Sequence, residues 1–517
     1  MPVDDVLGEY AARSLTRREF FGVAAAAGAV GVAAGTGTLQ PRRAAAGEPR
    51  IVIVGAGLAG LRCAHQLWVD GAAVGRPIAS TVYEADTTHV GGRCWSLRDY
   101  FSAGAVAEHG GAFINTGQRR IRRLAARLGL HEEVVNGGDL RAGEEVFFVG
   151  GQRYSYAEAN ADWAAVGFDA FHDAAAAAGP QPNYKHSTPE GRRLDNLAVP
   201  EWLDESGIGA TSRFGRLMQA NAVSEYGGNP SDQSALNLIY LLAWNARDSL
   251  QPLPGDDERF HIVGGNDQIV SRMAAQLPSG AVKMGYELIA VKANGDRGYT
   301  CSFQSGNAVV DVAADHVVLA LPFSTLRRVD LRHAGLSPLK LHAIRSQGMG
   351  DNAKIHVELE RKTWPALGYA GATYTDWDKF CTAWDGSVPL GAGGAPAILV
   401  AFPGGRAGAH KLTGAAHGPA PTPDVTWFLE QVEHVFPGTI AAHTGVAYED
   451  HWAVDPWHLG SYSYYRVGQF HTISGSEHRQ EGNLHFAGEH TSVSQQGFLE
   501  GAVESGERAA REIGHQI

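Results

Sequence analysis

The sequence predicts an α/β fold, or α+β across two domains, in which a Rossmann-like nucleotide-binding domain is interleaved with a second domain of mixed sheet and helices. Near the N-terminus, a β-rich apolar run, Ile51–Val54, enters a glycine-rich turn, as at the start of a dinucleotide-binding βαβ unit. A second glycine-rich block, Phe486–Gly501, follows another apolar run near the C-terminus. If both blocks bind one ligand, the nucleotide domain is built from separated segments.

Three glycines in the first block have distinct expected roles. Gly55 permits the tight turn, Gly57 lets the backbone approach a pyrophosphate, and Gly60 lets helix and strand pack closely. The helix is predicted over Leu58–Val69, and its N-terminus faces the phosphates. Strand, glycine turn and helix in this order favour a dinucleotide site over an ordinary βαβ turn.

The residues after this unit narrow the choice of dinucleotide. A second strand, Ala79–Tyr83, ends at Glu84, whose carboxylate is placed to accept hydrogen bonds from the adenosine ribose. This acid alone does not distinguish NAD from FAD. Beyond it, Gly91, Gly92 and Arg93 offer a flexible backbone and a guanidinium that can reach the pyrophosphate or the flavin edge.

Together with motifs further along, these residues resemble the flavin-containing amine oxidases, the family that includes monoamine, polyamine and L-amino acid oxidases. The resemblance spans nearly the whole chain in the family's order and rests on Gly55, Gly57 and Gly60, Glu84, Gly91 to Arg93, Glu108 to Ala112, Ala314 to Pro322, Lys354, Gly460 to Ser463 and the C-terminal block. It implies FAD as cofactor, held by Gly55, Gly57, Ala59, Gly60, Glu84, Ala85, Gly92, Arg93, Gly110, Gly111, Ala112, Phe113, Leu288, Gly488, Glu489, Gly497 and Phe498.

The resemblance also implies three catalytic residues. Lys354 matches the family lysine that holds a water near flavin N5, where an ammonium stabilises negative charge on the reduced flavin. Tyr462 and Phe498 match two aromatic rings that form a slot for the amine, although many members carry Tyr in place of Phe498. Ser461 stands where monoamine oxidases carry the cysteine that bonds to the flavin. A serine cannot form that thioether, so FAD binding is expected to be non-covalent.

The implied reaction is oxidative deamination. A neutral amine gives hydride from its α-carbon to flavin N5, water hydrolyses the imine to an aldehyde, and dioxygen is reduced to hydrogen peroxide. Residues 110–115 lack the Gly-x-Met-Arg-like context in which L-amino acid oxidases carry a carboxylate-binding arginine, which favours an amine without a carboxylate. Arg213 or Arg247 remains able to replace that arginine. Three alternatives therefore stay open. They are an L-amino acid oxidase, a dehydrogenase with another electron acceptor, and a non-catalytic flavin-binding scaffold.

Composition limits the partners. With 517 residues, 44% of them apolar, the chain is long enough for two or three globular domains. A formal net charge of −12 argues against nucleic acid as a partner. The four cysteines have neither disulfide nor metal-ligand spacing, so we expect free thiols and no metal. A homodimer stays possible.

The N-terminus has the form of a twin-arginine export signal. Arg17 and Arg18 precede an Ala/Gly/Val run over residues 22–34, and Ala44–Ala46 offers a cleavage motif. The run is too short and too weakly apolar for a stable membrane span. Residues 1–46 are therefore predicted to be a signal peptide read by the twin-arginine export machinery. The mature protein is then periplasmic or extracellular.

The remaining chain divides into interleaved segments. The FAD-binding domain is predicted over 48–105, 255–330 and 470–517, and the substrate-binding domain over 106–254 and 331–469. Within these segments we expect a helix over Arg120–Leu130 and a buried helix over Ser234–Trp244. A loop is expected over Ala176–Pro200, and Gly386–Pro423 is expected to contain a single strand, Ala397–Phe402. The C-terminal helix is predicted over Gly501–Ile513, with Glu504 and Glu507 facing solvent.

Overall fold

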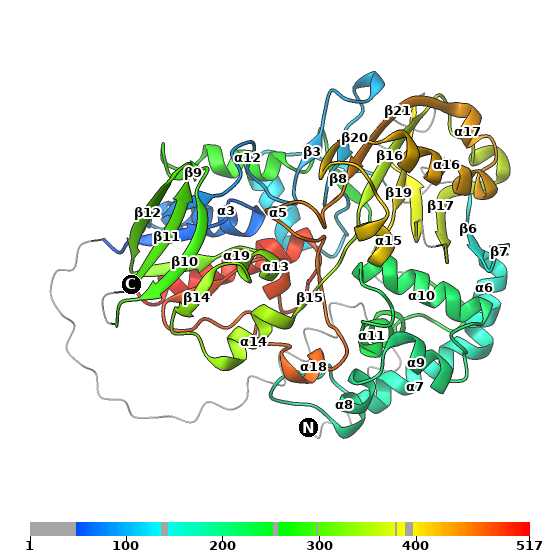
Figure 1. Cartoon of the computed structure of the whole chain (residues 1–517), viewed down its shortest axis with the longest axis horizontal. Coiled ribbons are helices and arrows are strands. Elements are labelled where there is room, and N and C mark those ends of the chain that lie inside the picture. The colour runs from blue at the N-terminus through cyan, green and yellow to red at the C-terminus, as the bar shows by residue number, and fades with distance from the viewer. Residues whose placement is uncertain (1–47, 136–142, 252–256, 296–297, 378–379, 388–395) are drawn as a thin grey trace.

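The computed structural model describes residues 48–135, 143–251, 257–295, 298–377, 380–387 and 396–517. The predicted signal peptide, 1–46, lies outside the described residues. Figure 1 shows two sheets with the first and last segments of the chain on one side of the molecule, and a large sheet with a group of helices on the other. The predicted α/β fold with two interleaved domains is confirmed.

A parallel five-stranded sheet forms the centre of the nucleotide-binding domain. Its order is β23-β13-β1-β2-β9, with β1 over Ile51–Val54, β2 over Thr81–Glu84, β9 over Val282–Met284, β13 over His316–Leu319 and β23 over Leu484–Phe486. All neighbouring strands are parallel. Each strand falls within one of the three predicted FAD-binding segments. Parallel strands buried on both faces need apolar side chains throughout, and β1 and β13 are buried at every position.

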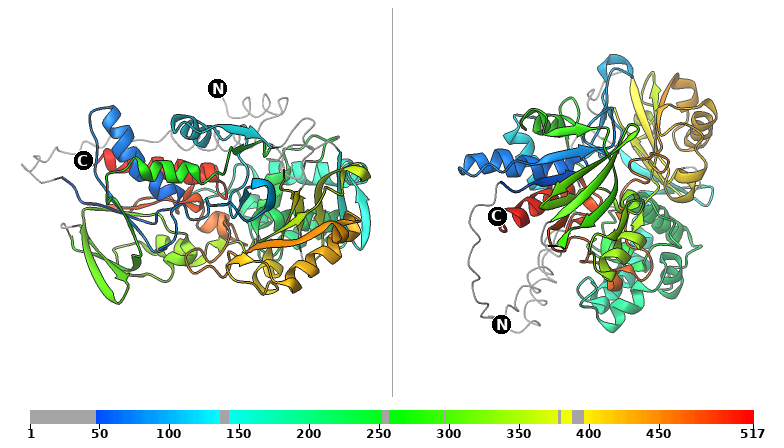
Figure 2. Two further views of the ribbon diagram at one scale, coloured as in Figure 1. Left: turned by 90° about the horizontal axis from the view of Figure 1, so that it is seen from above. Right: turned by 60° about the vertical axis from the view of Figure 1, so that its left-hand side comes forward.

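Three helices cover this sheet. They are α3 over Leu58–His65, which continues through a π-helical turn over Gln66–Asp70, α12 over Gln268–Ala275 and α19 over Leu499–Gly514. Figure 2 shows α3 (blue) beside the C-terminal α19 (red). The two helices pack closely because Gly506 carries no side chain: a Cβ there would lie 2.4 Å from the Ala59 carbonyl oxygen. α3 and α19, which lie far apart in the sequence, thus form one layer.

A second sheet flanks this domain. Its order is β12-β11-β10-β14, with β10 over Glu287–Ala293, β11 over Tyr299–Ser305, β12 over Ala308–Ala314 and β14 over Asp330–His333. Residues 282–292 thus contain two strands, β9 and β10, which belong to different sheets. β14 crosses the domain boundary that was predicted at residue 330.

The second domain contains an eight-stranded sheet. Its order is β20 (His417–Pro419), β21 (His443–Asp450), β16 (Lys354–Leu359), β19 (Ala397–Phe402), β18 (Thr382–Asp385), β17 (Tyr369–Thr375), β6 (Glu144–Val149) and β7 (Gln152–Ser155). Apolar residues of α16, Thr422–Val435, share a core with β16 and β19. This packing positions Lys354 at the start of a central, fully buried strand.

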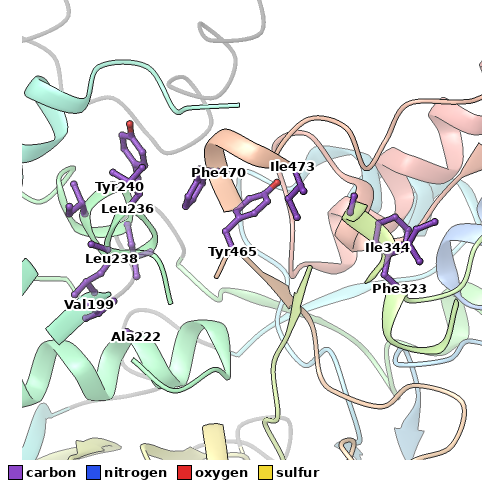
Figure 3. Close-up of a cluster of buried hydrophobic side chains, with 14 of the residues drawn as sticks. Val199, Ala222, Leu236, Leu238, Tyr240, Phe323, Ile344, Tyr465, Phe470 and Ile473 are labelled. Carbon is purple, nitrogen blue, oxygen red and sulfur yellow. The ribbon is translucent and has the colours of Figure 1, made fainter. Parts of the chain in front are cut away.

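Helices complete this domain. They are α6 (Tyr156–Asp162), α7 (Phe168–Ala178), α8 (Pro189–Asp195), α9 (Val199–Glu205), α10 (Arg213–Tyr226) and α11 (Ala235–Leu242). α11 is buried at every residue, which confirms the predicted helix. Figure 3 shows Leu236 and Tyr240 of α11 near Phe470 and Tyr465, in a cluster that extends to Phe323. One hydrophobic core thus joins the helices to the nucleotide-binding domain.

Shorter elements connect these layers. Three two-stranded sheets pair β3 (Ser96–Leu97) with β4 (Ala107–Glu108), β5 (Glu132–Val134) with β8 (Phe260–Ile262), and β15 (Gly348–Met349) with β22 (Ser463–Tyr464). The short helices are α4 (Gly71–Ala73), α13 (Phe323–Leu326), α14 (Pro338–Ser346), α15 (Gly405–His410), α17 (Thr439–Ala442) and α18 (Gln469–Thr472). α5, Arg119–Arg127, buries Ile121 and Leu124, as the predicted helix requires. No helix in the described part of the chain is long and apolar enough to cross a membrane.

Two predicted loop regions were wrong in part. Ala176–Pro200 contains α8, which begins where the Thr188 hydroxyl accepts a hydrogen bond from the Gly191 amide and Pro189 opens the first turn. Gly386–Pro423 contains α15, β20 and the start of α16 besides the predicted strand. In both regions the Gly and Pro content hid short elements that tertiary packing stabilises.

The prediction that Glu507 faces solvent was also wrong. Its carboxylate binds the buried Arg62 side chain at 2.9 Å and Arg120 at 2.8 Å. Glu504 accepts hydrogen bonds from Ser492 and Ser494. Both carboxylates therefore tie α19 to neighbouring segments.

Candidate active site

A single cavity of about 920 Å³ brings most of the predicted site residues together. All three predicted catalytic residues, Lys354, Tyr462 and Phe498, line it. The predicted cofactor residues that line it are Gly55, Gly57, Ala59, Glu84, Gly92, Arg93, Gly110, Gly111, Ala112, Phe113, Gly488, Glu489, Gly497 and Phe498. The two distant glycine-rich blocks thus face the same space.

Three predicted cofactor residues are not among those that line the cavity. Gly60 has a packing role, because a Cβ there would lie 2.0 Å from the Gly55 carbonyl oxygen. Ala85 directly follows β2. Leu288 is buried in the hydrophobic core on β10, opposite Phe303 of β11.

The glycine turn is shaped for a ligand. Gly55 has φ of 100°, a conformation that disfavours other residues, and a Cβ there would lie 2.8 Å from the Ala320 carbonyl oxygen. A Cβ at Gly57 would meet only the Gly91 carbonyl oxygen, at 3.9 Å, so this side of Gly57 is open. α3 has no side-chain cap, and Leu58 and Ala59 of its first turn line the cavity. These uncapped amides are suited to a pyrophosphate.

Glu84 fixes this turn and keeps acceptor capacity. Its Oε2 accepts a hydrogen bond from the Ala56 amide at 2.6 Å, and its Oε1 accepts one from the Asp86 amide at 3.0 Å. A carboxylate has about four acceptor positions. The two that remain match the two hydroxyls of a ribose.

Arg93 and Glu489 join the two ends of the site. The Arg93 guanidinium lies 3.1 Å from Glu489 Oε1 and also donates to the Ser461 carbonyl oxygen. Glu489 Oε2 accepts from the Ser463 hydroxyl at 2.9 Å and from the Gly497 amide at 2.8 Å. This buried carboxylate therefore holds together the segments that carry Arg93, Tyr462 and Phe498.

Lys354 is almost fully buried at the cavity wall. Its Nζ donates hydrogen bonds to the carbonyl oxygens of Glu108, at 2.8 Å, and Gly110, at 2.6 Å. Burial lowers the pKa of Lys354 to about 8, although the carboxylates of Asp450, Glu108 and Glu258 favour the charged form. An ammonium has three donors, so one N–H is left for a water molecule in the cavity.

The Tyr462 ring is fixed by its hydroxyl, which donates to the Ser224 carbonyl oxygen at 2.7 Å. Burial raises the pKa of Tyr462 well above its ordinary value. A Cβ on Gly497 would lie 3.8 Å from the Tyr462 ring, so the residue before Phe498 sits beside that ring. Ser461 is turned toward Asn352, whose side-chain oxygen accepts from its hydroxyl at 2.7 Å.

Several cavity residues were missed from the sequence. They include the carboxylates Glu145, Glu225 and Glu258 and the aromatic residues Tyr374, Trp384 and Phe402, which lie on β6, α10, the segment before β8, and strands β17 to β19. None belongs to a glycine-rich fingerprint. All but Glu258 reach the cavity because the eight-stranded sheet and α10 fold over it, and Glu258 reaches it from the segment before β8. No local sequence pattern marks these residues.

The two arginines left open as carboxylate ligands lie elsewhere. Arg213 binds Glu158 and Asp162 and stacks on Tyr154, and Arg247 binds Asp169. Neither lines the cavity.

One cluster differs from the expectation of no metal-ligand grouping. The ligand atoms of His109, His417 and Asp450 lie within 4.8 Å of one another. Both histidines, however, place Nδ1 at hydrogen-bond distance from Asp450 Oδ1, 2.6 and 2.7 Å. Zinc bonds of about 2.0–2.1 Å in a tetrahedron would separate ligand atoms by about 3.3 Å. These distances favour a hydrogen-bond network. The four cysteines are buried free thiols, as predicted.

Comparison with known proteins agrees with this geometry. The model of the family described as flavin containing amine oxidoreductase matches residues 58–514. The chain belongs to this family. The match runs from the start of α3 to the end of α19. It includes the C-terminal glycine-rich block and begins directly after the first strand and the turn at Gly55 and Gly57.

Relatives within the family carry different names. The chain is 24% identical to an L-amino acid dehydrogenase of Synechocystis, over 89% of this chain and 94% of that protein, and 26% identical to putrescine oxidase of Kocuria rosea, over 90% and 95%. A solved cyclohexylamine oxidase of Brevibacterium oxydans superposes with a TM-score of 0.74 at 21% identity, covering 91% of this chain and 99% of that one. These matches establish a flavin-containing amine oxidoreductase and leave substrate and electron acceptor open.

Proposed function

We propose that this protein is an FAD-dependent amine oxidase that deaminates an amine without a carboxylate and uses dioxygen as electron acceptor. The observation that carries the proposal is the shared cavity, in which Lys354, Tyr462 and Phe498 face the same space as the glycine turn at Gly55 and Gly57. A flavin-binding scaffold has no need of a buried lysine and two aromatic walls beside its nucleotide site.

The residues present fit FAD. The open side of Gly57 and the uncapped amides of α3 suit the pyrophosphate, and the free acceptor positions of Glu84 suit the ribose. When bound, FAD supplies a two-electron acceptor for the amine and passes the electrons on to dioxygen. Ser461 offers no thiol for a covalent bond, so acid denaturation is expected to release the flavin into solution.

The chain's own residues position and desolvate the amine. Tyr462 is held in one orientation by its bond to the Ser224 carbonyl, and with Phe498 it offers an apolar wall where the neutral amine is favoured over the ammonium. Lys354 keeps one N–H for a water and places positive charge beside the reacting region. Fixed orientation of the substrate supplies much of the rate in this scheme.

The charged residues of the cavity support an amine substrate. Glu145, Glu225 and Glu258 line it from β6, α10 and the segment before β8. Carboxylates and aromatic faces attract an approaching ammonium group and repel a carboxylate. Arg93, a cavity arginine next to the glycine turn, is already engaged by Glu489.

An anaerobic panel of matched substrates tests this proposal. 2-Phenylethylamine and phenylalanine differ by the carboxylate alone, so bleaching of the flavin by the amine and not by the amino acid is the expected result. Admission of air is then expected to restore the colour and release hydrogen peroxide. Bleaching by the amino acid alone contradicts the amine assignment, and a flavin that stays bleached in air contradicts the oxidase assignment.

L-Amino acid oxidation is a second candidate. Arg479 and Lys185 also line the cavity, and either cation is suited to a substrate carboxylate. A relative bears the name L-amino acid dehydrogenase. An Arg479→Gln variant separates the candidates, since it is expected to leave amine oxidation unchanged and to impair only a reaction that depends on a carboxylate.

A further inference from the structure

A row of three charged side chains runs across strands β20, β21 and β16 of the eight-stranded sheet and ends at the cavity. The register of neighbouring antiparallel strands pairs His417 of β20 with Asp450 of β21, and Asp450 with Lys354 of β16. Residues directly opposite on such strands point to the same face, with Cβ atoms about 4.5–5.5 Å apart. Asp450 therefore lies between the histidine on one side and the lysine on the other.

Hydrogen bonds extend this row on the side of His417. Asp450 is completely buried and binds Nδ1 of His109 at 2.6 Å and Nδ1 of His417 at 2.7 Å. The other ring nitrogen of His417 contacts Asp455 at 2.8 Å. With a carboxylate on each nitrogen, both nitrogens donate and the ring is an imidazolium. Burial opposes this charge, but the two carboxylates raise the pKa of His417 to about 9.

Lys354 is connected to Asp450 by a second route. Its Nζ binds the carbonyl oxygens of Glu108 and Gly110, which flank His109 in the chain. The His109 ring is in turn held by Asp450. Asp450 thus acts on the lysine through its charge across the strands and through the segment that positions the ammonium.

We infer that Asp450 holds Lys354 in its ammonium form and that the His417 imidazolium weakens this effect, so that the two residues set the pH range over which Lys354 presents positive charge to the cavity. Both are positioning residues, since neither is among the residues that line the cavity. The consequence for catalysis rests on the proposed function, whereas the coupling of charges does not.

Other groups face the same two residues. The titratable groups that interact with Lys354 or Asp450 include Glu108, Glu258, Tyr448, Glu449, His109, His356 and His417. His356, two positions along β16 from Lys354, is fully buried with Nε2 3.4 Å from Asp450 Oδ2. Burial lowers the pKa of His356, so this ring is neutral and adds no competing cation at neutral pH. The test therefore replaces the charged side chains of Asp450 and His417.

The reactivity of Lys354 measures its charge directly. The purified, flavin-loaded full-length protein is acetylated in trace amounts at a series of pH values from mildly acidic to strongly alkaline. Mass spectrometry of the Lys354 peptide then gives the midpoint at which the amine becomes neutral. Asp450→Asn is expected to lower this midpoint by about one pH unit or more, because a negative neighbour is lost. His417→Gln is expected to raise it, because a positive neighbour is lost.

The opposite directions distinguish coupling from a loosened fold. Entry of water relieves desolvation and raises the midpoint of a buried lysine in any variant. A downward shift in Asp450→Asn therefore has an electrostatic origin. If that variant does not fold, His417→Gln still tests the inference, since His417 lies on the outermost strand β20 and an unchanged midpoint there overturns it.

Glu358→Gln is the matched control. Glu358 lies four residues along β16 on the same face as Lys354, is buried, and binds Ser102 and Thr444 in place of the network. The Lys354 midpoint in Glu358→Gln is expected to equal that of the wild type. Binding of zinc to the wild type in a stoichiometric amount, and its loss in His417→Gln, would also overturn the inference. That result would favour a metal site at His109, His417 and Asp450. A wild-type flavin that no amine bleaches refutes the proposed function and leaves these midpoints unaffected.

Discussion

At the scale of single residues, the site depends on buried groups whose polar atoms are fixed before a ligand arrives. Glu489 binds Arg93, Ser463 and the Gly497 amide. The Tyr462 hydroxyl is engaged by the Ser224 carbonyl. Because these partners already hold the side chains, little ordering is left for the moment of substrate binding, which is the condition for efficient positioning.

Lys354→Met is expected to slow reoxidation of the reduced flavin by about tenfold or more, because a positive charge beside the reacting region is lost. The pH dependence has a defined sign. The pKa of Lys354 is about 8, so the ammonium predominates below this pH and is lost as pH rises through it. Stopped-flow reoxidation of photoreduced wild type should therefore slow above about pH 8. The Met variant should lack this step, and equal profiles for both proteins would exclude the assigned role.

At the scale of elements, the strand, turn and helix around Gly55 show how backbone conformation creates the nucleotide site. Gly55→Ala is expected to cost about 1–3 kcal/mol of unfolding free energy from its disfavoured φ alone. Further loss comes from the Cβ, 2.8 Å from the Ala320 carbonyl oxygen. Flavin content and urea unfolding measure both effects.

Gly150→Ala is the matched control for this variant. Gly150 also has positive φ, 62°, but nothing lies within 4 Å of an added Cβ. It is expected to lose about 1–2 kcal/mol and to keep its flavin. Equal flavin loss in both variants would mean that the close approach at Gly55 is unimportant.

The packing of α19 on α3 also depends on a buried ion pair. The Arg62 side chain is only 3% exposed and binds Glu507 and Asp70, each at 2.9 Å. Glu507→Gln is expected to destabilise the protein by about 1–3 kcal/mol, because a buried guanidinium keeps only one carboxylate. Glu205→Gln removes one of the two exposed carboxylate partners of Arg193 and should change stability by less than about 1 kcal/mol. Similar unfolding midpoints for both variants would contradict a stabilising role for Glu507.

The elements differ in how far the sequence could predict them. β1, the turn and α3 were predictable because their glycines and apolar residues have local causes. α8 was missed although Thr188 and Pro189 form a recognisable helix start, because the surrounding Pro and Gly content indicated a loop. The sequence could not predict the cavity residues Glu225 and Tyr374, since the position of α10 and the order of distant strands bring them to the site. It could not predict Asp450 either, since strand register alone places that residue beside Lys354.

At the scale of the whole molecule, the cavity is built from segments that lie near opposite ends of the described part of the chain. β1 pairs with β13, and β13 with β23, so the strands of this sheet that come first and last in the sequence both flank β13. Gly57 and Gly488 then face one cavity. We therefore expect the proposed FAD site to form only after β23 and α19 have folded.

This order of events bears on export, which we propose follows the twin-arginine route from the Arg17-Arg18 motif. That route moves folded proteins, whereas a chain threaded unfolded would leave the cytoplasm before its FAD site exists. Replacing both arginines with lysine should hold the protein in the cytoplasm with its flavin bound and its signal uncleaved. Cell fractionation, flavin absorbance and the mass of the N-terminal peptide measure these outcomes. Continued export of the double-lysine variant would refute the twin-arginine assignment, and retention of a flavin-free protein would contradict folding before export.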